Sequence, residues 1–580
     1  MARVEYQKKN SISPKVIYGG LLIAVLMIVS AILLLLYPFA SKEKALYFEG
    51  ENPILFQGEQ HGNALIEGET VFVSFSFMKQ YIDENIIFDE KSQSVIITTA
   101  GKVIQMPTDS LSLFVNEEPV NLEISPTITK EGETYIALDP ILPYYPIQYK
   151  KLKDTEAIWI QRDGEQYSRG KVIAKDVHEE KLRLRTEPSL KSPYTGEMTK
   201  QEPLMIEGEK EGYYLVRKEN GVSGYLKKAF VTKEEDVAIT ITHQAATHTV
   251  PLLDGPVHLT WEAVYTKNPD HTKISDMTGV NVVSPTWFSL TDQEGTIKNL
   301  ASLDYSKWAQ SKGYQVWGLF SNSFDPDLTH EALKDFETRQ NIIRQLLHFS
   351  QMYELQGINF DIENVYQKDG PLVTQFMREA TPYLHEAGLV VSMDITFYAG
   401  ENNNWSSFYE RPKLAEIVDY IVVMAYDEHT GSASGAGSVS SLPWVERNLQ
   451  KLLTEVPKEK LILGVPLYTR LWKEQLKEDG TTEVSAKALS MNQVKNWLNE
   501  KGLAAVYDPE SGQNYAEYYD TAEKATYKIW IEDEQSLNKR AELALSYQLA
   551  GIGTWSRFFG DETAWAALDL NIDRAVTRND

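Results

Sequence analysis

The 580-residue chain contains no cysteine, which excludes a disulfide framework. Basic residues are also scarce, because 57 Lys and Arg stand against 82 Asp and Glu, for a formal net charge of −25. Phosphate binding needs a basic face, so this excess of acid argues against a nucleic-acid partner. Only ten histidines occur, and the nearest pair, His243 and His248, matches no metal-ligand spacing. We therefore expect neither a metal nor a cofactor.

Residues 16–39, VIYGGLLIAVLMIVSAILLLLYPF, carry no charge. About 20 such residues suffice to cross a bilayer. Several basic side chains in residues 1–15 favour a cytoplasmic tail, with everything after residue 41 outside the cell. These basic residues are Arg3, Lys8, Lys9 and Lys15. The sequence thus predicts a single-pass anchor in the cell membrane, with the N-terminus in the cytoplasm and the domains that follow the anchor outside the cell.

The alternative is a secreted protein, released by cleavage of a signal peptide near Ala40. The apolar region of a signal peptide is about 7–15 residues long, which is shorter than this run. A cysteine-free ectodomain fits a bacterial surface protein, in particular one of Gram-positive bacteria (Firmicutes).

Residues 45–165 alternate short apolar strands with turn signals, which predicts a β-rich domain. The stretches ALIEGETVFVSFSFMKQY and IIFDEKSQSVIITT resemble the N-terminal domain of copper amine oxidases, a stalk-like module of bacterial surface proteins. His61 is the single histidine of this region, so the resemblance implies no copper site. Its expected role is to hold the following domains away from the membrane.

Residues 168–233 form a second small β unit, in which RTEPS, GYYLV and GYLKKAFV follow one another. This order resembles bacterial Src-homology-3-like (SH3-like) domains, which implies cell-wall peptide as a partner or packing on a neighbouring domain. Tyr213, Tyr214 and Tyr225 are candidates to line a groove, with the domain core as the alternative.

From residue 250 to 575 apolar strands alternate with amphipathic helical segments, which predicts an α/β fold of the (β/α)8 TIM-barrel type. The eight candidate strands are HLTWEAVY, GVNVVSPTWF, YQVWGLFSN, GINFDIENV, LVVSMDITF, DYIVVMAYD, KLILGVPLY and GIGTWSRF. Residues 471–530 are too long for a loop between the last two strands, so we expect an insertion there. The predicted architecture is a transmembrane helix, two small β-rich domains and a barrel.

The fourth strand, GINFDIENV, carries two acids two positions apart. Side chains alternate along a strand, so Asn359, Asp361 and Glu363 should face the barrel interior. Two buried carboxyls close together resist joint ionisation, which raises a pKa and keeps an acid protonated near neutral pH. A structural ion pair is the alternative reading, but the strand supplies no Lys or Arg.

Four motifs in order resemble glycoside hydrolase family 18, the chitinase-like family. These are QGINFDIE, VVMAYD, LILGVPLYTR and LAGIGTWS. The last of them, with the segment YKIWIEDEQSLNKRAELALSYQ before it, looks like members that act on bacterial spore or cell walls. The resemblance covers residues 255–570 and implies a retaining glycosidase that needs no metal or cofactor.

The resemblance also implies roles for single residues. Glu363 would be the general acid and base, and Asp361 would orient the substrate's 2-acetamido group, whose oxygen attacks the anomeric carbon to give an oxazolinium intermediate. Tyr426 would donate to that oxygen, and Trp555 would lie under the sugar. The implied set of catalytic residues is Glu363, Asp361 and Tyr426, and the substrate-binding set is Asn359, Asp427, Met424, Trp555, Tyr468, Arg470 and Trp287.

The chain departs from the family pattern at Gln356 and Asn359, where the family carries Asp, and at Thr469, where it carries Gly. Asn359 keeps a hydrogen bond but lacks the charge that partners the next carboxylate. Further rim candidates for sugar contact are Phe288, Phe320, Asn322, Asp394, Phe397, Tyr398 and Trp472.

The expected function is cleavage of β-1,4 bonds after N-acetylglucosamine in peptidoglycan or a related envelope glycan. Two alternatives stay open. One keeps the enzyme and changes the substrate to chitin or another N-acetylglucosamine-containing glycan. The other is a non-catalytic glycan-binding protein, against which the presence of Glu363, Asp361 and Tyr426 argues.

Overall fold

The computed structural model describes residues 13–36, 40–173, 177–242, 253–477 and 479–571. The chain divides into two compact units. The first contains Met1–Glu84 and Thr127–Gln244, and the second contains Asn85–Pro126 and Ala245–Asp580. Most of the basic N-terminal tail and the pair His243 and His248 lie outside the described residues.

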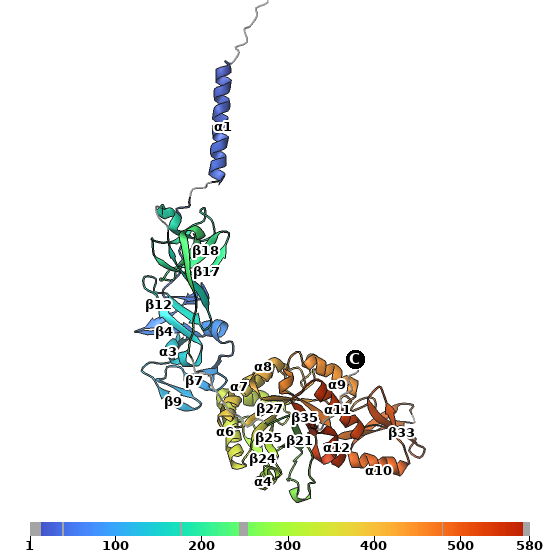
Figure 1. The fold of residues 1–580 in the computed structure, drawn as a ribbon. Helices are drawn as coiled ribbons and strands as arrows, with labels where there is room; N and C mark the ends of the chain where they lie inside the picture. Colours follow the sequence, from blue (N-terminus) through green and yellow to red (C-terminus); the bar gives the residue numbers. More distant parts are fainter. Residues whose placement is uncertain (1–12, 37–39, 174–176, 243–252, 478, 572–580) are drawn as a thin grey trace, which may run out of the picture. The chain divides into compact units, whose positions relative to one another are not determined.

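Helix α1 (Pro14–Leu36) contains the uncharged run. Its segment Pro14–Leu33 is long and apolar enough to cross a membrane, and none of its most apolar stretch is buried by the rest of the chain (Figure 1). A signal sequence would meet the same criteria of length and composition. The predicted N-terminal apolar helix is therefore confirmed, and its length and composition fit an anchor and a signal sequence alike.

Three sheets make up the rest of the first unit. One has the order β12-β13-β1-β2 and another the order β10-β11-β4-β3, with the short helices α2 (Phe75–Phe77) and α3 (Leu138–Ile141) beside them. The strands are β1 (Pro53–Phe56), β2 (Glu59–Asn63), β3 (Leu65–Glu67), β4 (Thr70–Ser74), β10 (Thr127–Lys130), β11 (Glu133–Ala137), β12 (Ile147–Lys151) and β13 (Ile158–Arg162).

The third sheet is the SH3-like domain, with seven strands in the order β16-β15-β19-β18-β17-β14-β20 around a small apolar core. They are β14 (Gln166–Val172), β15 (Arg183–Arg185), β16 (Tyr194–Glu197), β17 (Pro203–Lys210), β18 (Tyr213–Arg217), β19 (Ser223–Lys227) and β20 (Val231–Ala238). Tyr213 is buried, whereas Tyr214 and Tyr225 are half-buried.

The second unit is built on a closed barrel of parallel strands in the order β22-β21-β35-β29-β28-β27-β26-β25, closed by pairing of β22 with β25 (Figure 1). Its strands are β21 (Val257–Glu262), β22 (Val282–Pro285), β25 (Gln315–Ser321), β26 (Gly357–Asp361), β27 (Val390–Thr396), β28 (Tyr420–Met424), β29 (Leu461–Pro466) and β35 (Gly551–Trp555). All eight predicted strands are present in sequence order, so the predicted TIM barrel is confirmed.

Helices cover the outside of the barrel, and a hairpin of β23 (Phe288–Leu290) and β24 (Ile297–Asn299) extends the sheet beside β25. The helices are α4 (Leu303–Ser311), α5 (Pro326–Leu333), α6 (Phe336–Met352), α7 (Gly370–Glu386), α8 (Arg411–Ile417), α9 (Leu442–Leu452), α11 (Glu534–Ser546) and α12 (Glu562–Leu568). Five of these helices, α4, α5, α6, α11 and α12, begin with a side chain that caps a backbone amide. Asp335, for example, accepts a hydrogen bond from the Thr338 amide at the start of α6.

The two faces of β26 pack as the alternation predicts. Ile358, Phe360 and Ile362 belong to the apolar core between strands and helices. Inside the barrel a second apolar core, which includes Leu259, Trp261, Trp317 and Val422, fills the lower layers. The inward positions become polar only near the carboxyl ends of the strands, and this is where Asn359 and Asp361 lie.

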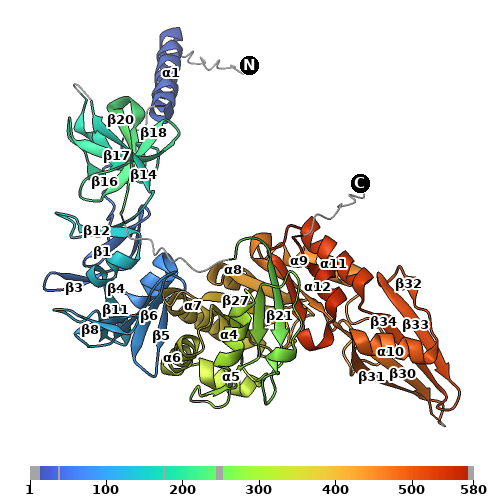
Figure 2. The same cartoon turned by 60° about the horizontal axis from the view of Figure 1, so that its bottom comes forward.

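Between β29 and α11 the chain forms a separate five-stranded sheet with helix α10 (Met491–Lys501) (Figure 2). Its strands are β30 (Tyr468–Leu476), β31 (Thr482–Ser490), β32 (Val506–Asp508), β33 (Gln513–Asp520) and β34 (Ala525–Ile531).

A last sheet belongs to the second unit although it precedes the SH3-like domain in sequence. It consists of β5 (Ile87–Asp89), β6 (Ser94–Thr98), β7 (Val103–Pro107), β8 (Ser112–Val115) and β9 (Glu118–Asn121), and it lies beside α6 and α7 (Figure 2). Asp89 Oδ1 accepts from the Phe336 amide at 2.8 Å, and Lys91 pairs with Asp335 at 3.1 Å. Ile96 and Val103 belong to the outer core of the barrel.

Candidate functional site

Two acidic residues stand where β26 ends. Asp361 is the last residue of the strand and is 7% exposed, and Glu363 follows it half-buried. Asn322, just after β25, fixes the backbone at Glu363 from both sides: its Nδ2 donates to the Glu363 carbonyl at 2.7 Å, and its Oδ1 accepts from the Glu363 amide at 3.0 Å. Tyr409 donates its hydroxyl to the Ile362 carbonyl at 2.9 Å. The backbone that carries both acids is therefore held by two other segments of the barrel.

No cation neutralises these acids. Among the described residues, no Lys, Arg or His forms a salt bridge with Asp361 or Glu363, and buried Oδ1 of Asp361 has no hydrogen-bond partner. Burial raises the pKa of Asp361 to about 7. Burial, and then the charges of Asp361 and Asp427, raise the pKa of Glu363 well above its ordinary value. The pair therefore retains a proton at neutral pH.

Asn359 lies one inward position below Asp361 and is fully buried. Its Oδ1 accepts from Trp261 Nε1 at 2.9 Å and from the Ser284 hydroxyl at 3.0 Å. Its Nδ2 donates to Ser392 Oγ at 3.0 Å and to Asp394 Oδ1 at 2.8 Å. All the hydrogen-bonding capacity of this amide is thus used by four protein groups on three other strands, β21, β22 and β27.

Tyr426 follows β28 and is half-buried. Burial is the main cause that raises its pKa well above the ordinary value, followed by the charges of Tyr468, Asp394, Glu363 and Asp361. The phenol is thus a neutral hydroxyl beside the carboxyls. Met424, the last residue of β28, is also half-buried.

Asp427 is held by residues that follow β29. Arg470 Nη2 donates to Asp427 Oδ1 at 2.6 Å, and the Tyr468 hydroxyl donates to the same oxygen. The ring of Tyr468 also meets that of Tyr426 edge-on, with centroids 6.3 Å apart. Three residues predicted to bind substrate therefore bind one another and order the rim beside Tyr426.

The comparison with known families identifies the barrel. Residues 275–560 match the model of glycosyl hydrolases family 18. The barrel belongs to this family. The barrel is therefore a glycosidase domain. Residues 57–158 match the copper amine oxidase N-terminal domain and residues 180–232 match the bacterial SH3 domain, which confirms the other two resemblances.

Relatives of the family 18 barrel include a bacterial glycosylase and a cortical fragment-lytic enzyme. The uncharacterized glycosylase YvbX of Bacillus subtilis is 25% identical over 299 residues, 50% of this chain and 84% of the relative. The cortical fragment-lytic enzyme of the same species is 26% identical over 255 residues, 44% of this chain and 58% of the relative. The crystal structure of the spore cortex-lytic enzyme SleL of Bacillus megaterium has 19% identity and a TM-score of 0.48, with 59% of this chain and 77% of that chain covered.

The aromatic residues of the family 18 barrel fall into two groups. Trp555, the last residue of β35, is half-buried, and its ring lies 5.9 Å from that of Trp261. Trp287, predicted to bind substrate, is instead 1% exposed and donates its indole N–H to Asn268 at 2.6 Å. It packs in the outer core, as do Phe288, Phe320 and Phe397, and Trp472 is likewise buried.

The exposed aromatic side chains near the two acids are different ones. Tyr398 is 54% exposed and Trp405 48% exposed, and both follow β27. Phe324, which follows β25, lies 6.3 Å from Trp405 between ring centroids. Of these three, the sequence pattern singled out only Tyr398. Phe324 and Trp405 lie in loops without a periodic pattern, so no sequence signal separates them from ordinary loop residues.

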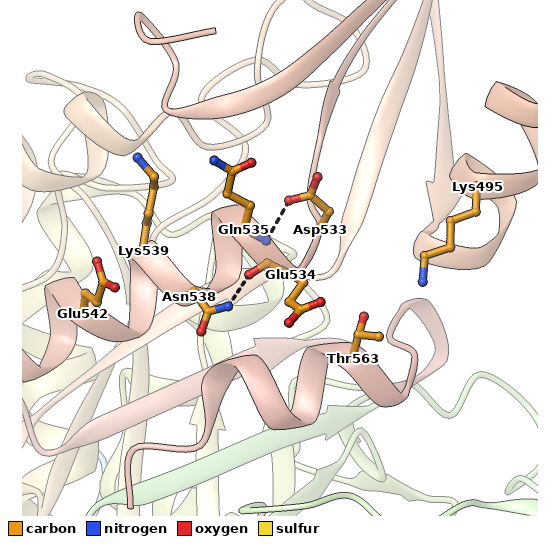
Figure 3. Close-up of a pocket in the computed structure, with 8 residues that line it drawn as sticks. All are labelled: Lys495, Asp533, Glu534, Gln535, Asn538, Lys539, Glu542 and Thr563. Atoms are coloured by element: carbon orange, nitrogen blue, oxygen red, sulfur yellow. Dashed lines mark hydrogen bonds between the residues drawn. The ribbon is translucent and has the colours of Figure 1, made fainter. Parts of the chain in front are cut away.

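A cavity of about 590 Å³ lies away from these strand ends, between α11, α12 and Lys495 of α10 (Figure 3). Its polar groups are largely satisfied within the chain. Asp533 accepts from the Gln535 amide, and Asn538 donates to the Glu534 carbonyl. Lys495 pairs with Asp561 at 2.6 Å. This cavity therefore differs from the site at β26, where two acids lie without a salt bridge.

Metal chemistry was not expected from the sequence. Within the described ranges, no group of three or more His, Asp or Glu side chains has the geometry of a metal site. Whether the protein needs a cofactor stays a prediction.

Proposed function

We propose that the barrel cleaves β-1,4 bonds after N-acetylglucosamine with retention of configuration, by substrate-assisted catalysis. The observation that carries the proposal is the pair of buried Asp361 and half-buried Glu363 at the carboxyl ends of the strands, without a salt bridge to any cation of the described residues. A carboxyl kept neutral near pH 7 is what protonation of a glycosidic oxygen requires.

In the first step Glu363 gives its proton to the leaving glycosidic oxygen while the acetamido oxygen of the same sugar attacks the anomeric carbon. The C–O bond to the leaving group breaks, and an oxazolinium ring forms. Asp361 accepts a hydrogen bond from the acetamido N–H and balances the positive charge. The Tyr426 hydroxyl donates to the acetamido oxygen, which aligns it for attack.

In the second step Glu363, now a carboxylate, takes a proton from water as that water attacks the anomeric carbon and opens the ring. The two inversions give net retention, and Glu363 is restored as an acid. Trp555 would support the sugar ring from below, and Met424 and Asp427 would line the adjacent wall. Arg470 and Tyr468 would fix Asp427. Asn359 and Trp287 would not touch the sugar, because their polar groups are buried and bonded within the chain.

Peptidoglycan or a related envelope glycan is the proposed substrate. Relatives of the barrel are named cortical fragment-lytic enzymes, and the chain combines an apolar N-terminal helix with a stalk-like domain and an SH3-like domain. We propose that α1 anchors the protein in the cell membrane with the barrel outside. The SH3-like domain would contact cell-wall peptide. Chitin is the second candidate, since other relatives are named di-N-acetylchitobiase.

The test is product analysis by mass spectrometry. The full chain in detergent is given chitooligosaccharides and, separately, purified peptidoglycan, with E363Q as the matched control. Soluble wall fragments that vanish with E363Q, a loss of roughly 10²–10⁴-fold, would support the proposal. The sugar at the reducing end of these fragments identifies the bond that is cleaved. Oligomers whose acetamido groups have been removed should resist cleavage, because they lack the internal nucleophile. Cleavage of the oligomers alone would favour chitin, and binding without cleavage of any glycan would favour a lectin.

A further inference from the structure

The mechanism above gives no role to a buried carboxyl on the strand next to β26. Asp394 lies on β27 and is 1% exposed. Among the described residues it forms no salt bridge. An isolated buried carboxylate is costly, so a carboxyl retained there must hold a proton or share one.

Strand register sets this carboxyl beside Asp361. β26 and β27 pair in parallel with Asn359 opposite Ser392 and Phe360 opposite Met393. Continued by one residue, this register places Asp361 opposite Asp394. Both side chains point into the barrel, because the inward parity of β26 is that of Asn359 and Asp361, and Asn359 bonds directly to Asp394.

The hydrogen bonds of Asn359 fix its amide in one orientation. The indole of Trp261 can only donate, so the atom that it meets must be the amide oxygen. The amide nitrogen therefore faces Ser392 and Asp394. An amide N–H of this kind can stabilise a carboxylate on Asp394, but it can neither accept nor release a proton. The carboxyl function that the family places at position 359 is therefore absent at that position and present on the neighbouring strand.

We infer that Asp394 is the proton partner of Asp361, taking the place of the missing carboxyl at Asn359 from the adjacent strand. The inference rests on the proposed function. Before substrate binds, one proton is shared between the two aspartates. When the acetamido N–H approaches, the O–H bond on Asp361 breaks, the proton forms an O–H bond on Asp394, and the freed carboxylate of Asp361 accepts the hydrogen bond. Asp394 is a positioning residue, because it acts on the substrate only through Asp361.

The electrostatics agree with this arrangement. Burial, and then the charge of Asp361, raise the pKa of Asp394 well above its ordinary value, while the hydrogen bond from Asn359 opposes that rise. The charge of Asp394 also contributes to the raised pKa values of Tyr409 and Tyr426, which lie on other segments. The titratable groups that face Asp394 are Asp361, Glu363, Tyr409 and Tyr426.

The first experiment follows kcat and kcat/KM against pH with 4-methylumbelliferyl N,N′-diacetylchitobioside and the full chain in detergent. D394N removes a negative neighbour, so we expect kcat to fall roughly tenfold or more. The basic limb of the profile should move about one pH unit or more to lower pH. N359D/D394N returns a carboxyl to the cluster and should move the limb back. S392A removes a hydrogen bond to the Asn359 amide without removing a carboxyl. Both limbs of its pH–rate profile should therefore stay at the wild-type pH. D394N with wild-type limbs would overturn the inference, whatever its kcat.

A second measurement does not depend on activity. Thermal unfolding of the wild type, D361N, D394N and D361N/D394N forms a double-mutant cycle. If the two aspartates share a proton, the shifts in Tm should be non-additive at pH 8 and much closer to additive at pH 4, where both are neutral. Additive shifts at both pH values would contradict the inference. An inactive wild type with a non-additive cycle would reject the proposed function but retain the shared proton.

Discussion

Glu262 and Arg557 join the first and the last strand of the barrel at the end that carries the carboxyls. Arg557 Nη2 donates to Glu262 Oε1 at 3.0 Å, and its Nε donates to the other carboxylate oxygen. Glu262 ends β21 and is buried, and Arg557 comes two residues after Trp555. The pair therefore fixes the backbone just beyond the proposed sugar platform.

Breaking this pair from one side should destabilise the barrel. R557M leaves a buried carboxylate without its cation, so we expect a loss of about 3–5 kcal/mol in the free energy of unfolding. Urea denaturation measures it. E262M/R557M should recover most of the loss, because neither charge remains. K307M, which opens an exposed pair with Glu354, serves as the surface control and should cost under about 1 kcal/mol. Equal losses for R557M and K307M would show that the Glu262–Arg557 pair contributes nothing special.

Asp361 should make the barrel less stable as the pH rises. Its pKa is raised to about 7 in the folded state, against about 4 when unfolded. The stabilising contribution of its bound proton is therefore complete below about pH 4 and is lost as the pH rises through about 7. D361N should be more stable than the wild type at pH 8, by up to about 4 kcal/mol, and equal to it below pH 4. Tm against pH tests this, with S392A as a buried variant that keeps the wild-type slope. A D361N curve parallel to the wild type would refute it.

His258, in contrast, should make the barrel more stable as the pH rises. It is buried near the start of β21, and burial lowers its pKa to about 4. A histidine with a lowered folded pKa contributes stability that is present above its unfolded pKa of about 6.5 and lost as the pH falls through about 4. We expect H258Q to lose less stability than the wild type between pH 6.5 and pH 4, with a difference approaching about 3 kcal/mol. Unfolding at several pH values over this range provides the check, and identical slopes would be the contrary result.

Substitutions of Trp555 and Trp287 should separate an effect on substrate binding from an effect on core packing. W555A is expected to lower kcat/KM roughly tenfold or more, equivalent to at least about 1.4 kcal/mol of transition-state stabilisation, with little change in Tm. W287A opens a cavity in the outer core and should cost about 3–5 kcal/mol of stability. Kinetics on the cleaved glycan and calorimetry, run on both variants, distinguish the two. A W287A protein of normal stability and impaired binding would reverse the assignment.

The fold could be predicted from the sequence because the sequence patterns that specify it are local. Eight apolar runs alternating with amphipathic helices predict a barrel from periodicity alone, and the parity of β26 correctly separates Ile358 and Phe360 from Asn359 and Asp361. The strand-end position of Asp361 follows from the same parity.

What the sequence did not predict depends on contacts between distant segments. Trp287 follows an apolar strand just as Trp555 ends one, and only the packing of the hairpin β23–β24 separates the buried ring from the half-buried one. The bonds from Asn322 and Tyr409 to the backbone around Glu363 join segments that are 41 and 47 residues apart in sequence. Glu262 carried a usable signal, because an acid that ends an apolar strand is the pattern that drew attention to Asp361.

The sheet of residues 85–126 gives the second unit an unusual order of synthesis. The ribosome completes this sheet before it makes the SH3-like domain, and α6 and α7, against which the sheet packs, come more than 200 residues later. At roughly 5–20 residues per second, the apolar face that contains Ile96 and Val103 waits on the order of tens of seconds for its partner. Apolar surface that stays exposed during folding is prone to aggregation. The sheet can therefore complete its packing only after α6 and α7 have been made, although five further helices are still to come.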